Sequence, residues 1–510
     1  MNRTKKFMLN TIASALYQVI VMLVGIITPR IMLVVYGSEV NGLVSSITQF
    51  VSYFTIVEAG LSSAAVYSLY KPIADNDTGA ISRIVTATRN FYYKSGAVFS
   101  GLLGLLAALY PVFVKTQVLS PGLVAILVLV LGANSVIDFF LLAKYRAILS
   151  ADQRSYVISI GSMISTLINF AIVVILSNKS VNIVFLKTVA ITAVIFRSLY
   201  LFYYCRKHYG YLNFKVKPDN AALSKRWSAF YLQLLQVVQR GAPTVLITFF
   251  STLQNVSIYS IFNMVITGVS SLLDIFMSGL SASFGDIIVQ NDLPKLQKTY
   301  RDFEFTYYGL ITIVYGVTLV LIMPFIRIYT KGIVDANYNQ PMIGILFVVY
   351  AYLYNVKTPQ GMLTISAGLF KETRMQCTIQ ALLVIIIGVV LAPTFGLAGV
   401  LVALIVSNTY RDIDLMCFIP KHVTKLPIRE TAFRILRSII TLLLIILPAR
   451  FVFIKQMTGY VEWVLHGVGI VIYATLVWLV ISYLFEREQL ISVKNRMFAM
   501  LHIKQKRFVA

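Results

Sequence analysis

Apolar residues run along this chain in long stretches that short polar connections separate. A helix rises about 1.5 Å per residue, so crossing the hydrocarbon core of a bilayer takes about 20 apolar residues. Fourteen stretches reach this length, and each is predicted to form a membrane-spanning α-helix. Their centres are Leu23, Phe54, Leu102, Leu131, Ile168, Ile191, Leu235, Ile266, Val314, Val349, Ile386, Leu404, Leu443 and Ala474.

The pattern of these stretches is duplicated along the chain. Seven residues recur 214 positions later, namely Ser14, Ala15, Tyr17, Pro29, Asn41, Ser46 and Ile47 as Ser228, Ala229, Tyr231, Pro243, Asn255, Ser260 and Ile261. After a short insertion, Gly60-Leu61-Ser62 returns as Gly279-Leu280-Ser281, Asn76-Asp77 as Asn291-Asp292, and Tyr92-Tyr93 as Tyr307-Tyr308. A duplicated membrane bundle is typical of a transporter whose substrate site lies between two lobes.

The repeat organises the predicted helices into four regions. Residues 1–222 and 223–428 are predicted to form two lobes of six helices each, and residues 429–485 two extra helices. Residues 486–510 are predicted to form a basic amphipathic helix on the inner membrane surface, or else to act only as a topology signal. Because each copy has an even number of spans, a pseudo-twofold axis along the membrane normal is expected to relate the lobes. The predicted fold class is an all-α polytopic membrane protein.

Composition and charge agree with this class. The chain is 58% hydrophobic and 13% charged, with a mean hydropathy of +0.80, which excludes a water-soluble globular protein. The net charge of +24 would suggest nucleic acid in a soluble protein, but Lys and Arg collect in alternate connections such as Arg206–Arg226 and Lys421–Arg437. This bias follows the positive-inside rule and predicts that both termini are cytoplasmic. Membrane lipids, and no nucleic acid, are therefore the expected general partners.

Several kinds of chemistry lack their motifs in this sequence. No G-x-x-x-x-G-K-[ST] loop is present, and the four histidines and three cysteines are scattered, so neither a nucleotide-hydrolysing loop nor a metal site is predicted. Asp412-Ile413-Asp414 has the D-x-D spacing of cation-dependent sugar transferases, but the adjacent Arg411 favours an ion pair. The expected protein is not an enzyme and holds no cofactor or metal.

Seven ionisable residues fall inside the predicted spans, where a charge costs at least about 2.5 kcal/mol on insertion scales. They are Arg30, Glu58, Asp138, Lys187, Arg240, Asp274 and Lys357. Two interpretations stay open for the deepest cations, Arg240 and Lys357. They pair with Glu58, Asp138 or Asp274 and hold the bundle together, or they join Arg30 in a hydrated cavity that binds an anion such as a diphosphate.

Amide side chains accompany these charges. Gln18, Gln49, Gln236 and Gln239 fall on the first two helices of a lobe or on their repeat equivalents. Hydrogen bonds between helices are one use for them, and hydrogen bonds to a passing glycan are the other.

The segment Asn41–Ala65 with its Glu58-Ala59-Gly60-Leu61 turn, the loop through Arg83 and Arg89, and the repeat of these features at Asn255–Tyr308 resemble a known group. They resemble the multidrug/oligosaccharidyl-lipid/polysaccharide (MOP) exporter superfamily, and within it the Wzx-type polysaccharide transporters. The resemblance implies a two-lobed carrier that alternates between inward and outward openings.

The resemblance also implies a substrate and a location. The substrate would be an undecaprenyl-diphosphate-linked oligosaccharide, flipped from the cytoplasmic to the outer leaflet of the bacterial cytoplasmic membrane for cell-surface polysaccharide biosynthesis. Other polysaccharide-assembly proteins would be its partners. Proton or sodium coupling, seen across the superfamily, would fall to Glu58, Asp138 or Asp274.

Three other functions compete with this one. A MATE-like cation-coupled drug antiporter would use the buried carboxylates Glu58 and Asp274. A peptidoglycan-precursor flippase would share the fourteen spans, although the first two helices lack a dense arginine cluster. A membrane glycan polymerase or ligase would need a large outer loop, and the predicted outer connections are short.

Overall fold

The computed structural model describes residues 3–58, 61–220, 226–277, 280–452 and 457–507 of the 510-residue chain. The described residues divide into two compact units. The first contains residues up to 261 together with 332–336, and the second contains residues 262–331 and those from 337 onwards. The boundary predicted at residues 222 and 223 lies outside the described residues, as do Ala59, Gly60 and Gly279 of the repeated turn.

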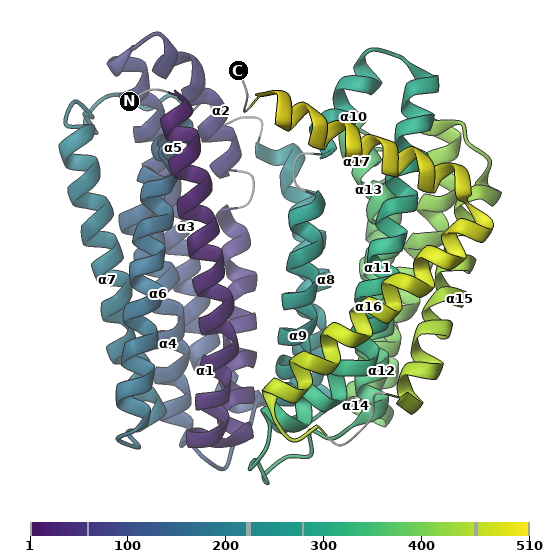
Figure 1. Cartoon of the computed structure of the whole chain (residues 1–510). Coiled ribbons are helices and arrows are strands. Elements are labelled where there is room, and N and C mark those ends of the chain that lie inside the picture. Colours follow the sequence, from purple (N-terminus) through teal and green to yellow (C-terminus); the bar gives the residue numbers. More distant parts are fainter. Residues whose placement is uncertain (1–2, 59–60, 221–225, 278–279, 453–456, 508–510) are drawn as a thin grey trace. The chain divides into compact units, whose positions relative to one another are not determined.

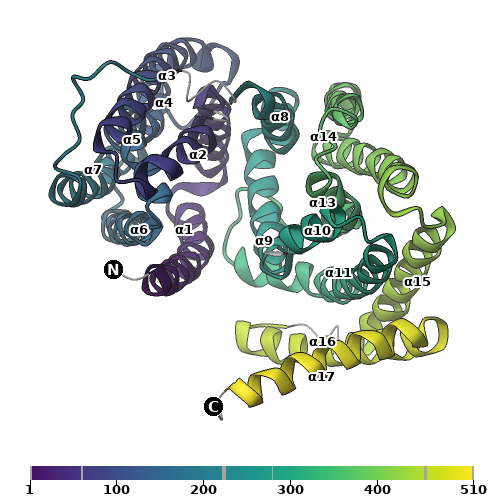
Figure 2. The same cartoon turned by 90° about the horizontal axis from the view of Figure 1, so that it is seen from above.

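The first unit is built from long helices that run side by side (Figure 1). Its elements are α1 (Arg3–Phe54), η1 (Thr55–Glu58), α2 (Leu61–Ala74), α3 (Thr78–Phe113), α4 (Pro121–Ile137), η2 (Asp138–Leu142), α5 (Ala143–Ala151), α6 (Ser155–Ser177), α7 (Ile183–His208), α8 (Arg226–Phe250) and the beginning of α9 (Leu253–Met277). Seen end-on, α6 lies between α1 and α7 (Figure 2). Leu43, Phe99, Leu127 and Ile148 are fully buried in the core of this unit.

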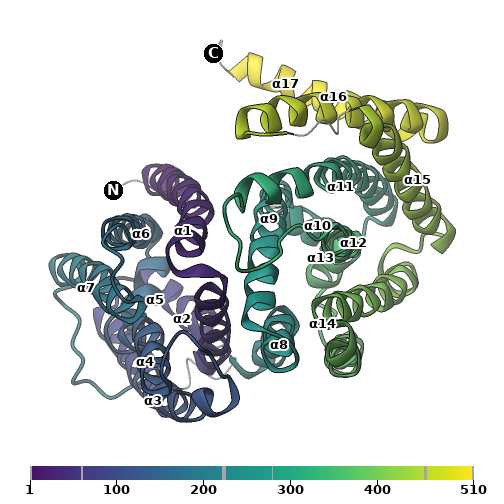
Figure 3. The same cartoon turned by 90° about the horizontal axis from the view of Figure 1, so that it is seen from below.

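The second unit is arranged around one long helix. Its elements are the rest of α9, then α10 (Leu280–Val289), α11 (Leu293–Tyr329), α12 (Pro341–Val356), α13 (Thr358–Ser366), α14 (Arg374–Ile419), η4 (Pro420–Thr424), α15 (Ile428–Val452), α16 (Tyr460–Phe485) and α17 (Arg487–Arg507). Helix α11 lies between α12 and α16 (Figure 3) and also packs on α15. Tyr307, Tyr308 and Tyr315 of α11 are fully buried by these neighbours.

Two of the longest helices contain a break at a glycine. Gly37 in α1 has φ 79° and ψ 173°, and Gly396 in α14 has φ 54° and ψ −129°. An L-residue with a side chain rarely adopts a positive φ, so glycine is the residue suited to both breaks. Each of these long elements is therefore two helices joined at an angle.

The helices agree with the predicted spans. Eleven helices among the described residues are long and apolar enough to cross a membrane. Both α1 and α14 hold two predicted centres, and α8, which is not among the eleven, holds Leu235, so all fourteen predicted centres lie in helices. The prediction of an all-helical, multi-pass membrane protein is confirmed.

The duplication is visible in the backbone of two turns. Asn76 and Asn291 both have a positive φ, of 54° and 55°. The next residue in each copy, Asp77 or Asp292, caps the following helix by accepting a backbone N–H three residues on. Gln153 and Gly368, 215 positions apart, likewise have φ values of 55° and 70°. The two copies thus enter and leave corresponding helices by the same turns.

Candidate functional site

A small charged cavity lies inside the first unit. Its volume is about 80 Å³, and its lining consists of Asp138, Leu142, Arg146, Ile158, Ser162, Arg197 and Leu201. Two ion pairs border it. The guanidinium Nη2 of Arg146 lies 3.3 Å from Oε2 of Glu58, and Arg197 of α7 contacts the carboxylate of Asp138. Two carboxylates and two guanidinium groups therefore meet here in a charge-balanced cluster.

The backbone around this cavity is irregular. Asp138 begins η2, a turn of π-helix that joins α4 to α5. Such π-turns are rare and are often found at functional sites. The neighbouring Phe139 packs tightly on α3, because a Cβ added to Gly96 would lie only 3.0 Å from the Cβ of Phe139. Gly96 therefore lets α3 approach η2 closely beside the charged pairs.

The cavity has room for water between its charges. One water molecule takes about 30 Å³ of the liquid, so a space of about 80 Å³ holds very few of them. Glu58 is within electrostatic reach of Asp138 as well as of Arg146. Two of the three predicted coupling carboxylates, Glu58 and Asp138, are thus brought together, whereas Asp274 is exposed on α9.

Lys357 lies in a second polar cluster, inside the second unit. It caps the C-terminus of α12, and its ammonium group donates a hydrogen bond to Oδ1 of Asn408 on α14. Its Nζ lies 4.7 Å from the centre of the Tyr354 ring. The carboxylate of Asp412 interacts with it electrostatically, and both oxygens of that carboxylate are buried and accept no hydrogen bond from the described residues. Lys357 and Asp412, both half-buried, thus carry opposite charges within one polar cluster.

Glu58, Asp138 and Asp274 are the partners that the sequence predicts for Lys357 if its role is structural. Glu58 and Asp138 instead pair with arginines of the first unit, and Lys357 donates a hydrogen bond to Asn408, with Asp412 within electrostatic reach. Asp412 and Asn408 lie one helical turn apart on α14, so both face the same neighbour.

The D-x-D segment divides between two contacts. The ion pair predicted between this segment and Arg411 is made by Asp414, and Asp412 interacts electrostatically with Lys357. The two carboxylates of the segment therefore have different cationic partners.

The remaining predicted residues are spread over α1, α7 and α8. Arg240 is exposed on α8, and no ion pair joins it to another described residue. Arg30 and Lys187 are half-buried on α1 and α7. The predicted glycan contacts are exposed at Gln18 and Gln236 and half-buried at Gln49 and Gln239.

One of these amides lies next to α8. The Gln49 side chain donates a hydrogen bond to Ser52 at 2.8 Å. A Cβ added to Gly241 would lie 2.4 Å from its Nε2 atom, so Gln49 fits against the backbone beside Arg240. Gln49 and the Arg240 segment are therefore neighbours within the first unit.

Solved structures show what this arrangement of helices is similar to. The lipid II flippase MurJ, in an inward closed conformation, matches with a TM-score of 0.68 and 17% identity over 95% of this chain and 100% of its own. An inward-facing multidrug resistance MATE family transporter of the MOP superfamily matches with a TM-score of 0.66 and 13% identity, over 80% of this chain and 96% of its own. A MATE in a bent conformation reaches 0.56 with 13% identity, over 84% of this chain and 96% of its own.

The chain has the fold of the MOP-superfamily transporters. No family model matches the sequence, and no curated protein matches it. These structural neighbours are named as a flippase and as transporters, not as enzymes. At identities of 13 to 17% the likeness establishes the fold alone, so the roles of individual residues have to be argued from this chain.

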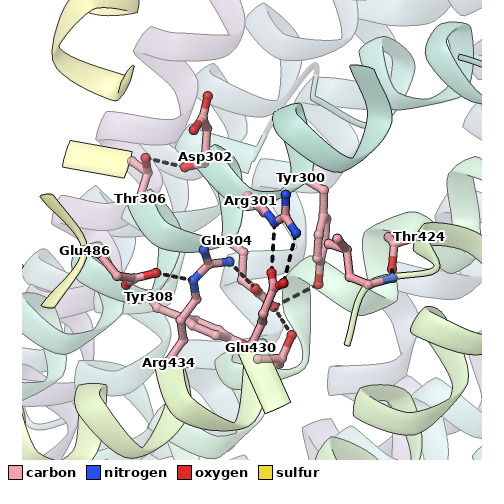
Figure 4. Close-up of polar contacts among 12 residues, drawn as sticks. Tyr300, Arg301, Asp302, Glu304, Thr306, Tyr308, Thr424, Glu430, Arg434 and Glu486 are labelled. Atoms are coloured by element: carbon pink, nitrogen blue, oxygen red, sulfur yellow. Dashed lines mark hydrogen bonds and ion pairs between the residues drawn. The ribbon is translucent and has the colours of Figure 1, made fainter. Parts of the chain in front are cut away.

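The most buried charges of this fold were missed by the sequence analysis. Glu304 of α11 is 1% exposed and Arg434 of α15 is 3% exposed. Figure 4 shows Arg434 between Glu304, at 2.7 Å, and Glu486, at 2.6 Å. Arg437 also contacts Glu486. This cluster, called here the Glu304 network, connects α11 to α15 and to the end of α16.

Glu304 is saturated by hydrogen bonds in addition to this ion pair. Its carboxylate accepts hydrogen bonds from Tyr300 at 3.0 Å, Gln360 at 3.1 Å and Thr431 at 2.9 Å. The Glu304 carboxylate therefore holds helices together and has no acceptor position left for a substrate. Two signals could have revealed it, a Glu at the point where the charged start of α11 passes into its apolar run and two arginines three residues apart in α15.

Arg146 and Arg197 were missed for different reasons. Arg146 stands in a basic connection that the sequence assigns to topology, and Arg197 is a second cation, after Lys187, within the apolar run of α7. The rule that intramembrane charges mark sites applied to Arg197 as well, and would have paired it with a carboxylate.

Proposed function

We propose that the protein is a flippase that moves a polyprenyl-diphosphate-linked oligosaccharide from the cytoplasmic to the outer leaflet by alternating access. The observation that carries the proposal is the extent of the likeness to a lipid II flippase. The match to the flippase covers 95% of the chain and so leaves about 26 residues unmatched. The two extra helices, from Ile428 to Phe485, contain 58 residues, so the match must include part of α15 or α16. The 80% match to the MATE transporter leaves about 100 residues outside, enough to omit both helices.

The chemistry of the substrate matches the exposed polar residues of the first unit. A diphosphate needs cationic partners, and the planar fork of an arginine can bind two phosphate oxygens. Arg240 has such a fork, exposed and without an ion-pair partner among the described residues, and Gln49 lies near its segment. Lys357 is engaged by Asn408 and Asp412, so we assign Arg240, with Arg30, the larger share of the anion binding. Gln18, Gln236 and Gln239 would contact the glycan.

The energy for export would come from the membrane. Moving a negative charge outward is downhill by about 2.3 kcal/mol per elementary charge per 100 mV. Proton or sodium coupling would add to this at the charged cavity, where Glu58 and Asp138 could exchange their arginine partners for an ion. The cell would be bacterial, the membrane cytoplasmic with both termini inside, and other polysaccharide-assembly proteins would supply and use the lipid-linked glycan.

A cation-coupled antiporter is the second candidate. It is favoured by the TM-score of 0.66 to the MATE transporter and by the paired carboxylates Glu58 and Asp138. In that case the carboxylates, and not Arg240, would carry transport.

One experiment separates these functions. Arg240→Ala, Glu58→Gln and Asp138→Asn variants are expressed in the native host, and their amounts in the membrane are matched. Surface glycan and lipid-linked intermediate in the inner leaflet are then measured. The flippase proposal expects Arg240→Ala to lower surface glycan at least about tenfold, since a charge-assisted contact to phosphate contributes about 1.5 to 3 kcal/mol.

The control is Arg429→Ala, which removes the same charge from an exposed position at the start of α15. It should export normally. Wild-type export by Arg240→Ala rules out the cationic site. Wild-type glycan in a strain without the protein, with increased drug sensitivity, selects the antiporter.

A further inference from the structure

A second cavity lies at one end of the first unit. It measures about 240 Å³ and is lined by Asn76 and Thr78 before and at the start of α3, by Asp152 and Arg154 between α5 and α6, and by His208 at the end of α7 with Tyr209 and Tyr211 after it, among others. It is called here the end pocket. Lys6 at the start of α1 reaches the same end, which the charge bias predicts to be cytoplasmic.

A carboxylate at the end pocket is shared by several groups. Asp152 contacts Lys6 at 2.6 Å and Nε of Arg154 at 2.7 Å, and the hydroxyl of Tyr209 donates a hydrogen bond to it at 2.7 Å. Burial, and then the hydrogen bond to Asp152, raise the pKa of the Tyr209 hydroxyl, so this group stays a donor. Lys6 and Arg154 thus share the carboxylate of Asp152, while Asp75 and Asp77 flank the lining residue Asn76.

The walls of the end pocket offer donors that are held in place. The ring of His208 stacks on Tyr204 with centroids 4.1 Å apart, and its Nδ1 lies 3.0 Å from the carbonyl oxygen of Tyr204. With Nδ1–H donated to that carbonyl, Nε2 is the ring atom left for a ligand, and it donates once the ring is protonated. The guanidinium of Arg154 lies over the Tyr209 ring, 5.6 Å from its centre.

The second copy shows that the fold does not require these polar groups. The turn at Asp152–Arg154 is closed by three backbone hydrogen bonds, and the turn at Ala367–Leu369 is closed by the same three, 215 residues on. Ala367 and Leu369 stand where the first copy has Asp152 and Arg154. His422 repeats His208 by stacking on Phe418, with centroids 4.2 Å apart. The charged wall is therefore an addition to a turn that forms without it.

We propose that the end pocket binds the phosphate group of an anionic membrane lipid. An Arg fork, a histidine nitrogen, an amide and hydroxyl groups are the donors that a phosphate takes. The pocket lies at helix ends, where lipid headgroups are expected, and the exposed Tyr211 has the amphipathic ring typical of that level. A soluble phosphate ester shares this chemistry and is the other source to be tested.

Binding of phosphatidylglycerol to the purified full-length protein, followed by native mass spectrometry with phosphatidylcholine as the uncharged reference lipid, tests the proposal. Arg154→Leu gives the first copy the residue that the second copy carries in the same turn, and His208→Gln removes the ring nitrogen. Each is expected to weaken the tightest phosphatidylglycerol site about tenfold. His422→Gln is the matched control, because it removes an equally stacked histidine away from the end pocket, and it should bind as the wild type does.

The outcomes are distinct. A lipid headgroup is supported if both pocket variants lose phosphatidylglycerol binding, His422→Gln keeps it, and inorganic phosphate does not compete with the lipid. Competition by inorganic phosphate that depends on Arg154 supports the same site with a soluble occupant. Wild-type binding by His208→Gln and Arg154→Leu overturns the proposal. His208→Gln decides alone if Arg154→Leu does not reach the membrane.

Discussion

Arg89 in α3 and Glu304 in α11 occupy corresponding positions of the two copies, three residues before the repeated tyrosine pair, and carry opposite charges. Arg89 is half-buried, donates to the carbonyl of Phe214 at 3.2 Å and lies over that ring, 5.0 Å from its centre. Glu304 is fully buried and binds Arg434 of α15. In the first unit the residue at this position binds the connection that follows α7. In the second unit it binds α15, one of the two extra helices.

The same contrast appears one turn and three turns further along these helices. Gly309 of α11 admits Trp478 of α16, since an added Cβ would lie 2.4 Å from its ring, and the corresponding residue of the first copy is the exposed Lys94. Gly316 faces Ile445 of α15 at 3.1 Å, whereas its counterpart Gly101 faces open space. The two copies therefore keep the same backbone shape. Single residues such as Gly309 and Gly316 fit the second copy to α15 and α16, which pack on it.

Breaking the Glu304 network should have the largest effect on this contrast. Glu304→Gln leaves Arg434 and Arg437 to share the single carboxylate of Glu486, so one buried positive charge is uncompensated, which typically costs about 3 to 5 kcal/mol. We expect a large fall in the thermal unfolding midpoint of the detergent-purified protein and the loss of α15 and α16 packing. Thermal unfolding followed by tryptophan fluorescence would measure it, because Trp478 lies in α16.

Glu430→Gln is the control for this loss. Its pair with Arg301 is also an Arg–Glu pair, bidentate at 2.8 and 2.9 Å, but the side chains of Glu430 and Arg301 are 29% and 37% exposed. Exposed pairs contribute about 1 kcal/mol or less. Equal midpoints for the two variants would contradict the structural role of Glu304.

Replacing these glycines with alanine should change the stability by an intermediate amount. The change should be a loss in the second copy and a gain in the first. Gly316→Ala pushes on Ile445, and Gly309→Ala on the larger Trp478, where overpacking typically costs about 1 to 3 kcal/mol. Gly101→Ala meets no neighbour and should stabilise α3 by about 1 kcal/mol, the ordinary gain of alanine over glycine in a helix. Stabilisation by all three substitutions would show that α15 and α16 do not pack where the structure has them.

The sequence predicted the helices better than the charges, for physical reasons. A membrane span needs a run of about 20 apolar residues, and this requirement is local, so all fourteen centres could be placed from the chain alone. The breaks at Gly37 and Gly396 were not predicted, because glycine is common within transmembrane helices and a positive φ leaves no other mark.

Partner choice among the charges depends on tertiary contacts that no spacing reveals. Glu58 and Asp138 were identified as buried carboxylates, but their partners come from α5 and α7. Arg434 was assigned to a cytoplasmic connection, since a basic residue near a helix end looks the same whether it faces water or Glu304. An ion pair of Arg411 with the D-x-D segment was predicted, but the sequence left open which carboxylate takes part; in the structure it is Asp414, three residues on along the same helix face.

The smallest effect is expected where α17 meets α11. Asp302 accepts a hydrogen bond from Ser492 at 3.0 Å and pairs with Arg496 at 2.9 Å, and the first copy has Ala87 at the corresponding position. Arg496 is 41% exposed, so Arg496→Ala should weaken the docking of α17 by less than about 1 kcal/mol. Asp302→Ala, which restores the residue of the first copy, removes both contacts and should release α17 further. Hydrogen exchange of the α17 amides measures this order, with Lys494→Ala as the control for loss of a charge. Equal protection in Asp302→Ala and the wild type would mean that apolar packing, and not Asp302, holds this helix against the second unit.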